Sequence, residues 1–299
     1  MPIGHTEQPT GLLDRSYRVL TRAFSRLPNS RDRVPAAGEL EKFKLAQRTA
    51  YECVTAVAAQ LREGITERET ATLLAEHLRA RGITRYLHTP FAWFGEHAAF
   101  DGYARYADYH ASDRALRGNE AVVLDVSPMV DGYIGDVGYA CSLQPNEELT
   151  RAKKFLQQLR ATIPLLFMSE RGTGEIWAEV DRLVRDAGFI NVHARYPLSV
   201  LGHRVFRVKP RAGEPLRLLR STYLGWFSVE ANLGFLRGGV LNQTLGPEHR
   251  GAKLGLWAIE PHIGWPGGGA KFEELLVVQE NRAWWLDDDV PHQAASYAR

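Results

Sequence analysis

The sequence AVVLDVSPMVDGYIGDVGYACSL, residues 121–143, decides the fold that we expect for this chain. Two apolar, strand-like runs flank the pair Asp131-Gly132. An Asp-Gly pair between such runs is a strong signal for a two-residue hairpin turn. With the turn at this pair, Val130 lies opposite Tyr133. The segment therefore predicts an antiparallel ribbon whose register can be followed residue by residue.

Two aspartates on this ribbon are expected to lie close together. The register places Ser127 opposite Asp136, and Asp125 shares a face with Ser127 because side chains alternate along a strand. Asp125 and Asp136 are then diagonal neighbours, about 7–8 Å apart. Two carboxylates in an apolar segment repel one another and lose hydration, and a cation between them removes both penalties. The alternative is a pair of exposed carboxylates, which the apolar neighbours of Asp125 disfavour.

Three later segments each place a metal-ligand residue in or beside a predicted strand. His203 follows an apolar run in LGHRV, Glu260 ends the apolar run of LWAIEPH, and Glu273 lies within GAKFEELLVV. Strands of this kind otherwise prefer hydrophobic residues. Carboxylates and imidazoles at such places are typical ligands of divalent transition metals.

Outward from the ribbon, the same order of elements occurs twice. The predicted elements are helices over 38–62 and 66–81, a strand over 121–126, helices over 147–168 and 175–186, and a strand over 189–193. Thr66 and Glu69 form a capping-box pattern at the start of the second helix. The phrases LLAEHLRARGI and EVDRLVRDAGF share spacing and chemistry about one hundred residues apart. A duplicated α+β domain with two similar halves explains this, and chance likeness of two amphipathic helices is the alternative.

The last third of the chain is expected to be rich in strands and turns. Strands are predicted over 254–260 and 271–278, joined by the glycine-rich GWPGGG, and residues 222–243 are aromatic and contain glycines. The acidic run 287–289 is interpreted as a solvated turn.

The five candidate ligands together resemble a metallopeptidase family that includes methionine aminopeptidase, aminopeptidase P, prolidase and creatinase. The positions that match the family's ligands, in the family's order, are Asp125, Asp136, His203, Glu260 and Glu273. The two aspartates lie eleven positions apart, as in the family. The resemblance covers roughly residues 38–285 and implies the pita-bread fold, with two pseudo-symmetric halves around a curved antiparallel sheet.

The resemblance also implies a role for each ligand in a site with two divalent ions, Mn, Co, Fe or Zn. Asp125 would chelate one ion, and Asp136 and Glu273 would bridge both. His203 and Glu260 would complete the second. A hydroxide between the ions would be the nucleophile, and Glu260 would also accept the proton of the attacking water.

Histidines on the substrate side depart from the family pattern. Members carry a histidine ahead of the first aspartate, for which His110 is the nearest candidate and His97 the runner-up. Ordinary packing is the alternative for both, and it is favoured for His97. A second histidine is expected about seven residues after His203, but Pro210 stands near that place. His262 would supply an imidazole from another direction, although a partly exposed turn histidine is the favoured interpretation.

Two further departures concern the surroundings of the site. The sequence from Asp136 onward is DVGYACS, whereas the prolidase branch often has D-x-T-R-T. Four aromatic residues are candidates for the wall of a substrate pocket, although a place in the core or at an interface is favoured for them: Tyr223, Trp226, Phe227 and Phe235.

Composition sets outer limits on function. The chain has 299 residues with 44% hydrophobic residues, 24% charged residues and a net charge of +2. This charge does not indicate a nucleic-acid or acidic-membrane partner, and no apolar run approaches a membrane span. Cys53 and Cys141 have no metal-ligand spacing and are interpreted as reduced thiols. We expect a cytoplasmic protein without a signal-peptide core.

Three parts of the chain are distinguished. Residues 1–36 are predicted to be an N-terminal arm, 37–290 the metallohydrolase domain, and 291–299 a C-terminal tail. The arm holds a basic amphipathic helix with Arg15, Arg18, Arg22 and Arg26. Packing on its own domain, or on a second subunit in a possible homodimer, is favoured over membrane binding or a transit sequence.

The leading functional hypothesis is a metal-dependent hydrolase of a peptide or small amide, an aminopeptidase or an Xaa-Pro-type peptidase. Two alternatives stay open. One is a non-peptidase hydrolase of a C–N bond in a small metabolite. The other is a non-catalytic module that binds peptides or proteins.

Overall fold

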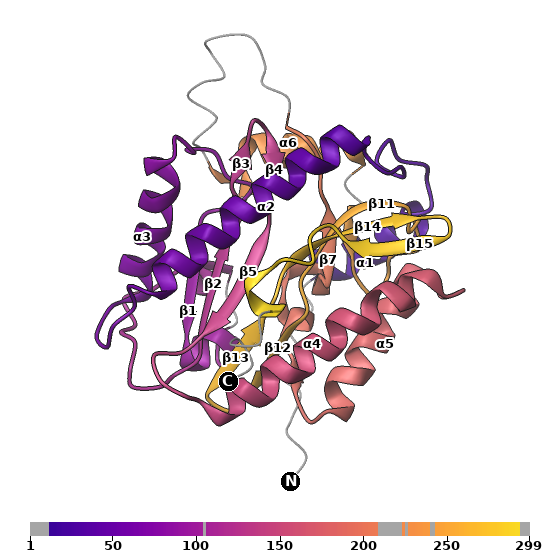
Figure 1. Ribbon diagram of the computed structural model, residues 1–299. Coiled ribbons are helices and arrows are strands. Elements are labelled where there is room, and N and C mark those ends of the chain that lie inside the picture. The colour runs from indigo at the N-terminus through magenta and orange to yellow at the C-terminus, as the bar shows by residue number, and fades with distance from the viewer. Residues whose placement is uncertain (1–11, 104–105, 209–222, 225–226, 240–242, 294–299) are drawn as a thin grey trace.

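The computed structural model describes residues 12–103, 106–208, 223–224, 227–239 and 243–293, and its elements are labelled in Figure 1. The helices are α1 (Leu12–Phe24), α2 (Ala37–Ala58), α3 (Glu67–Ala80), α4 (Glu147–Met168), α5 (Thr173–Asp186) and α6 (Val229–Gly238). The strands of the first half are β1 (Phe91–Phe94), β2 (Val122–Val126), β3 (Met129–Val130), β4 (Tyr133–Ile134) and β5 (Val137–Cys141). The later strands are β6 (Ile190–Asn191), β7 (Gly202–Arg204), β8 (Tyr223–Leu224), β9 (Phe227–Ser228), β10 (Thr244–Leu245), β11 (Gly255–Ile259), β12 (His262–Trp265), β13 (Gly268–Lys271), β14 (Glu274–Gln279) and β15 (Arg282–Trp285).

The predicted hairpin is confirmed in its position and register. Val130 pairs with Tyr133 in β3–β4, and Asp125 pairs with Gly138 in β2–β5. The turn residues Asp131 and Gly132 have φ values of 51° and 82°. Positive φ at both central positions is what a type I′ hairpin turn requires, and aspartate followed by glycine tolerates it best. Asp125 and Asp136 are therefore diagonal neighbours across the ribbon.

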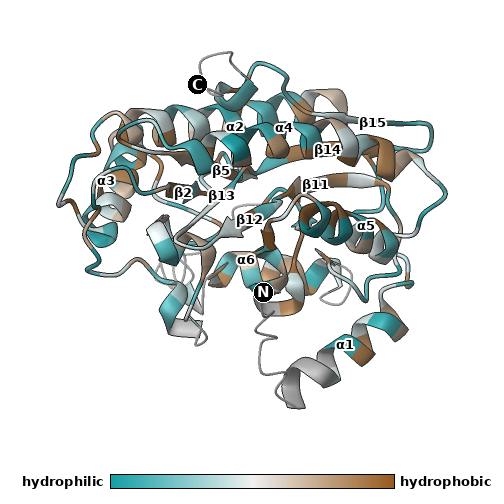
Figure 2. Ribbon diagram, turned by 90° about the horizontal axis from the view of Figure 1, so that it is seen from below, coloured by the Kyte–Doolittle hydropathy of each residue, from teal (hydrophilic) through white to brown (hydrophobic). Residues whose placement is uncertain are grey.

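The predicted repeat of helix pairs is also present. Both α2 and α4 have 22 residues, and both α3 and α5 have 14. Helix α3 begins with the predicted capping box, in which the Thr66 side chain accepts from the Glu69 N–H and the Glu69 carboxylate accepts from Thr66. Figure 2 shows α2 and α4 together on one side of the strands, with α1 and α6 on the other side. Each half of the chain thus contributes one long helix to the layer that covers this side of the strands.

Three antiparallel sheets make up the middle of the molecule. Their strand orders are β1-β2-β5, β10-β7-β11-β14-β15 and β13-β12-β6. The chain crosses between the second and third sheets twice, from β11 to β12 at Glu260 and from β13 to β14 at Glu273. The prediction of a single strand over 271–278 is therefore wrong. Lys271 ends β13 and β14 begins at Glu274, because the chain changes sheets at residues 272–273.

Two other expectations for the last third need correction. Helix α6 lies within the segment expected to be strands and turns. Its start is capped by the Ser228 side chain, and a Cβ at Gly234 would come within 2.1 Å of the Phe206 ring, so the glycine serves close packing there. The run 287–289 is not wholly solvated. Asp287 is 2% exposed and paired with Arg48, because the C-terminal segment folds back over α2.

The N-terminal helix α1 packs on its own chain. Thr21 and Ser25 are buried, and the Ser25 hydroxyl accepts a hydrogen bond of 2.9 Å from the Arg250 N–H. No helix within the described ranges is long and apolar enough to cross a membrane. The division of the chain at residues 36 and 290 stays a prediction.

Candidate metal centre

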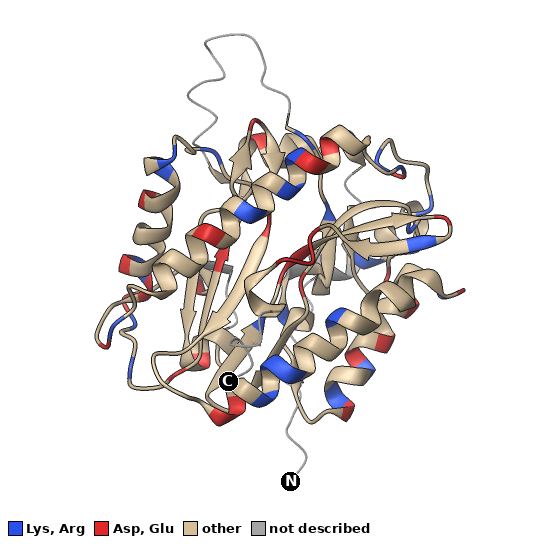
Figure 3. Cartoon of the chain, in the orientation of Figure 1, with Lys and Arg blue, Asp and Glu red and all other residues tan. Residues whose placement is uncertain are grey.

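Four carboxylates from distant parts of the chain meet beneath α2 and α4. Asp125 lies on β2 and Asp136 immediately precedes β5, while Glu260 and Glu273 occupy the two crossings between sheets. Their exposed fractions are 3%, 0%, 8% and 2%. In Figure 3, acidic positions are visible at the centre of the molecule among the strands. Such a concentration of buried carboxylates needs compensating positive charge.

The fifth predicted ligand, His203, reaches the same cluster from β7. Its Nε2 lies 3.1 Å from Asp136 Oδ2 and 3.7 Å from Glu273 Oε1. Strand pairing places His203 directly beside Ala258 of β11, so the histidine is held two residues from Glu260. The structure therefore brings all five residues predicted from the sequence into one buried cluster.

Lys271 is a member of the cluster that the sequence interpretation missed. Its Nζ donates hydrogen bonds to Asp125 Oδ2 (2.7 Å), Glu260 Oε2 (3.0 Å) and Glu273 Oε2 (3.0 Å). The side chain passes over Gly138, where a Cβ would lie 2.5 Å from Lys271 Cε. Burial lowers the pKa of Lys271, but the surrounding carboxylates outweigh it and raise the pKa well above its usual value. The lysine is thus a fixed ammonium ion.

His88 is the second residue that the sequence interpretation missed. Its Nε2 lies 3.3 Å from Asp125 Oδ1 and 3.3 Å from Asp136 Oδ1. The residue precedes β1, where its N–H donates a hydrogen bond of 3.0 Å to the Ser127 hydroxyl, and its ring stacks on Phe91. Only the pairing of this segment with the loop after β2 brings His88 to the aspartates, so no local spacing in the sequence indicates it.

Burial and neighbouring charges shift the pKa values of the acids in opposite directions. Burial raises the pKa of Asp136, but contacts with His203 and His88 outweigh it and hold that pKa well below its usual range. Burial and the neighbouring Glu273 raise the pKa of Glu260 to about 8. For His203, burial lowers the pKa, but Asp136 and Glu273 outweigh it and raise the pKa to about 10. Burial likewise lowers the pKa of His88, but the carboxylates outweigh it and raise that pKa, so both imidazoles carry pKa shifts caused by negative charge that a bound metal cation would neutralise.

The chemistry of the cluster fits a divalent cation. Asp125 Oδ1 and Asp136 Oδ2 are buried and accept no hydrogen bond from the described residues. Two groups of three donor atoms lie within 4.8 Å of one another, one formed by His88, Asp125 and Asp136 and the other by Asp136, His203 and Glu273. Carboxylate oxygens combined with imidazole nitrogens suit Mn, Fe, Co or Zn. Asp136 belongs to both groups and is the centre of the site.

The three other histidines named from the sequence have different surroundings. His110 is half-buried, with its ring 5.9 Å from that of Phe91, which in turn stacks on His88. His97 is buried, and its nitrogens contact Glu67 (2.8 Å) and the Asp108 carbonyl (2.8 Å), which is a packing role.

His262 is not the partly exposed turn residue expected from the sequence. It lies inside β12, is 0% exposed, and contacts the Tyr196 hydroxyl (2.7 Å) and the Ala98 carbonyl (2.6 Å). Burial holds the pKa of His262 well below its usual value. Both of its ring nitrogens are therefore engaged away from the carboxylates.

Two of the four named aromatic residues lie beside the cluster. The Phe235 ring is 5.9 Å from that of His203, and Phe227 forms a backbone bridge with His88. Tyr223 is half-buried in the first-half core. Trp226 and Pro210 lie outside the described residues.

Comparison with known proteins assigns the family. The profile of metallopeptidase family M24 matches residues 41–280, and the chain belongs to this family. An uncharacterized peptidase of Staphylococcus aureus is 26% identical over 161 residues, which cover 48% of this chain and 44% of the relative. This chain therefore matches less than half of that relative's length.

Solved structures of the family share the pita-bread fold. An X-Pro aminopeptidase from Thermotoga maritima matches with a TM-score of 0.57 and 19% identity over 85% of this chain and 62% of its own. Prolidase from Pyrococcus furiosus matches with a TM-score of 0.59 and 18% identity over 85% and 64%. At these identities the likeness concerns the fold alone, and it confirms the expected α+β pita-bread fold.

Proposed function

We propose that this chain is a metal-dependent peptidase that acts near a peptide N-terminus or at an Xaa-Pro-like bond. The observation that carries the proposal is the convergence of Asp125, Asp136, His203, Glu260 and Glu273 in one buried cluster, in which two carboxylate oxygens face only imidazole nitrogens. Membership of the family and the likeness to prolidase and aminopeptidase folds support this direction.

The residues divide into holding and proton-handling roles. Asp136, His203 and Glu273 would hold a divalent ion, with Asp125 on the neighbouring side of Asp136. When bound, divalent ions lower the pKa of water toward neutrality and stabilise negative charge that develops on a carbonyl oxygen. Glu260, whose pKa is raised to about 8, is suited to accept and return a proton near neutral pH.

His110 is the residue that we propose for contact with the substrate. It borders the cluster through Phe91, and burial lowers its pKa, which favours the neutral imidazole at pH 7. A neutral imidazole can donate a hydrogen bond to a substrate carbonyl without carrying charge into the site. Replacement of His110 by alanine should reduce turnover while metal affinity stays unchanged.

A different substrate on the same fold is the second candidate. The sequence contains no histidine between His203 and His249, so the histidine expected about seven residues after His203 is missing. This difference favours a small amide or another C–N substrate that needs fewer contacts than a peptide. Turnover of dipeptides, but not of guanidino or amide metabolites, would decide for the peptidase.

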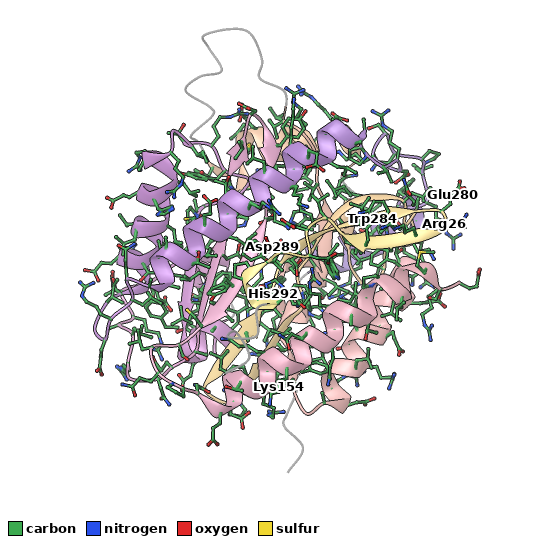
Figure 4. The ribbon with its side chains drawn as sticks, in the orientation of Figure 1. Arg26, Lys154, Glu280, Trp284, Asp289 and His292 are labelled. Carbon is green, nitrogen blue, oxygen red and sulfur yellow. The ribbon has the colours of Figure 1, made fainter. Side chains whose placement is uncertain are left out.

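The test combines a substrate screen with matched variants. Metal-free protein is loaded with Mn²⁺, Co²⁺, Fe²⁺ or Zn²⁺ and offered dipeptides, Xaa-Pro peptides and small amides. Asp136→Ala and Glu273→Ala should abolish turnover. Glu280→Ala is the control, because this exposed glutamate lies at the far tip of the β14–β15 hairpin (Figure 4). Turnover that survives both ligand substitutions would overturn the metal mechanism.

Several finer expectations remain predictions. Manganese as the working metal is tested by the same loading series. A homodimer is tested by light scattering coupled to size-exclusion chromatography. The two cysteines are free in the structure, and a reduced compartment such as the cytoplasm is tested by fractionation of cells.

A further inference from the structure

The ammonium of Lys271 binds carboxylate oxygens that a metal ion would otherwise use as ligands. This group binds one oxygen each of Asp125, Glu260 and Glu273 at 2.7–3.0 Å. An ammonium and a divalent ion that share one oxygen repel strongly at such short range in a buried site. Glu260 is 8% exposed, and its carboxylate accepts a hydrogen bond of 3.0 Å from the Lys271 ammonium. The lysine therefore competes directly with a metal for Glu260.

His88 stands in the same relation to Asp136 as His203 does. The two Nε2 atoms approach opposite oxygens of this carboxylate, His88 at Oδ1 (3.3 Å) and His203 at Oδ2 (3.1 Å). Each imidazole is buried, with exposed fractions of 7% and 6%. Asp136 is thus flanked by two imidazoles, although the sequence comparison provides only one of them as a ligand.

The tautomer of His88 is fixed in the way that metal-binding histidines require. Its Nδ1 lies 2.7 Å from the carbonyl of the next residue, Thr89, and the Nδ1 of His203 lies 3.2 Å from the carbonyl of its own next residue, Arg204. A carbonyl can only accept a hydrogen bond, so Nδ1 carries the proton. Nε2 faces the Asp125 and Asp136 carboxylates, which also only accept, so a cation that binds the Nε2 lone pair replaces the proton held there. Stacking on Phe91 at 5.0 Å holds the His88 ring in this plane.

We infer that this chain has exchanged one metal ligand: His88 coordinates the metal, and Lys271 holds Glu260 out of the coordination sphere. The inference rests on the metal site of the proposed function and does not depend on the substrate. It assigns His88, Asp125 and Asp136 to one side of the site and Asp136, His203 and Glu273 to the other. Glu260 keeps its place for proton transfer, fixed by the ammonium.

Metal affinity tests the exchange without any assay of activity. Metal-free wild type and variants are titrated with Mn²⁺ and Co²⁺ by calorimetry. His88→Ala should lose about tenfold or more in affinity, since even residues that only orient a ligand contribute 10–100-fold. Glu260→Gln should change affinity less than about threefold. His77→Ala, a half-buried histidine on α3, is the control and should match wild type.

Replacement of Lys271 should return Glu260 to the metal site. In Lys271→Met, Glu260 is released, so adding Glu260→Gln to this variant should lower metal affinity about tenfold or more. Wild-type affinity in His88→Ala, or a tenfold loss in Glu260→Gln alone, would overturn the inference. If His88→Ala does not fold, pulsed electron paramagnetic resonance of Mn²⁺-loaded wild type counts the coupled imidazole nitrogens. Two are expected, and one would overturn the inference.

Failure of the proposed function gives a different result. A wild type that takes up no metal and hydrolyses nothing contradicts the metal-dependent peptidase itself, together with this exchange. A wild type that binds metal through His203 and Glu260 but not His88 contradicts only the exchange.

Discussion

Two consecutive glutamates, Glu273 and Glu274, lie at the start of β14 and enter two different buried clusters. Glu273 joins the candidate metal centre. Glu274 accepts hydrogen bonds from Arg160 Nε (2.6 Å) and Nη2 (2.8 Å) and contacts His292 Nε2 at 2.5 Å. His292 is labelled in Figure 4 on the C-terminal segment, where Tyr51 of α2 and Gln157 of α4 both contact it.

The two clusters differ in how completely their acids are partnered. The guanidinium of Arg160 binds both oxygens of Glu274 in the fork geometry that makes arginine–carboxylate pairs strong. The metal centre instead holds four carboxylates with one lysine and the imidazoles of His88 and His203, and two of its oxygens make no well-oriented hydrogen bond to the described residues. A fully hydrogen-bonded pair stabilises the fold, whereas a cluster with more carboxylates than hydrogen-bond donors is organised to bind a cation. The predictions that follow test this contrast.

The largest effect is expected from Glu273→Gln. Loss of one ligand charge should lower hydrolysis and metal affinity more than about 100-fold, beyond the 10–100-fold of residues that only orient ligands. The metal-free variant should unfold at or above the wild-type temperature, because one repelling carboxylate is neutralised. Parallel assays of turnover and thermal unfolding check both parts. A large drop in metal-free stability would contradict the contrast.

Glu274→Gln should show the opposite pattern. The buried Arg160 charge loses its partner, and the free energy of unfolding should fall by about 3 kcal/mol, the low end for breaking a buried ion pair. Denaturant unfolding measures this loss. The folded fraction should bind metal with wild-type affinity, and a variant that is stable but unable to bind metal would show that the two clusters are not separate.

Asp287 extends the structural cluster and predicts a dependence of stability on pH. Burial raises its pKa, but hydrogen bonding by Arg48 outweighs this and holds the pKa below the usual 3.8. A lowered folded-state pKa stabilises the protein above the unfolded value and is lost as the pH falls through the folded value. Wild type should therefore lose stability below about pH 4. Asp287→Asn should remove this part of the acid sensitivity.

At neutral pH, Asp287→Asn should cost about 1.5 kcal/mol, the low end for a charged hydrogen bond, because Arg48 is 47% exposed. Unfolding curves between pH 3 and pH 7 measure both the slope and the offset. An unchanged acid slope in the variant would assign the acid sensitivity to other carboxylates.

The smallest effect is expected from Tyr51→Phe. The Tyr51 hydroxyl contacts His292 Nδ1 (3.1 Å) and the Glu273 carbonyl (3.3 Å), so it connects the two clusters. Its loss should lower the free energy of unfolding by about 1 kcal/mol. Metal affinity should change less than about threefold, because no metal ligand loses its charge. A larger change in affinity would show that the structural cluster orients Glu273.

The sequence was sufficient for the parts of the site that follow local rules. Asp131-Gly132 determines the turn, the turn determines the register, and the register brings Asp125 and Asp136 together. The capping box and the approximate bounds of α3 to α5 follow from helix patterns in the same way, whereas α2 ends at Ala58, four residues before the predicted end. These features depend on contacts between residues close in sequence, where alternation and turn chemistry suffice.

The parts that were missed depend on contacts between distant segments. His88 reaches Asp125 only through the pairing of its segment with the loop after β2. Lys271 had a usable signal, since it lies two residues before Glu273, but its three partners come from three different places. Helix α6 was missed because Gly234 weakens the helical pattern, and its packing against Phe206 outweighs that local preference.

Calorimetric titration of metal-free wild type, Glu273→Gln and Glu274→Gln with Mn²⁺ or Zn²⁺ tests the central claim most directly. Saturable binding should occur in wild type and in folded Glu274→Gln and should be lost in Glu273→Gln. Absence of binding in wild type, or equal binding by the two variants, would contradict a metal centre built from Asp125, Asp136, His203 and Glu273.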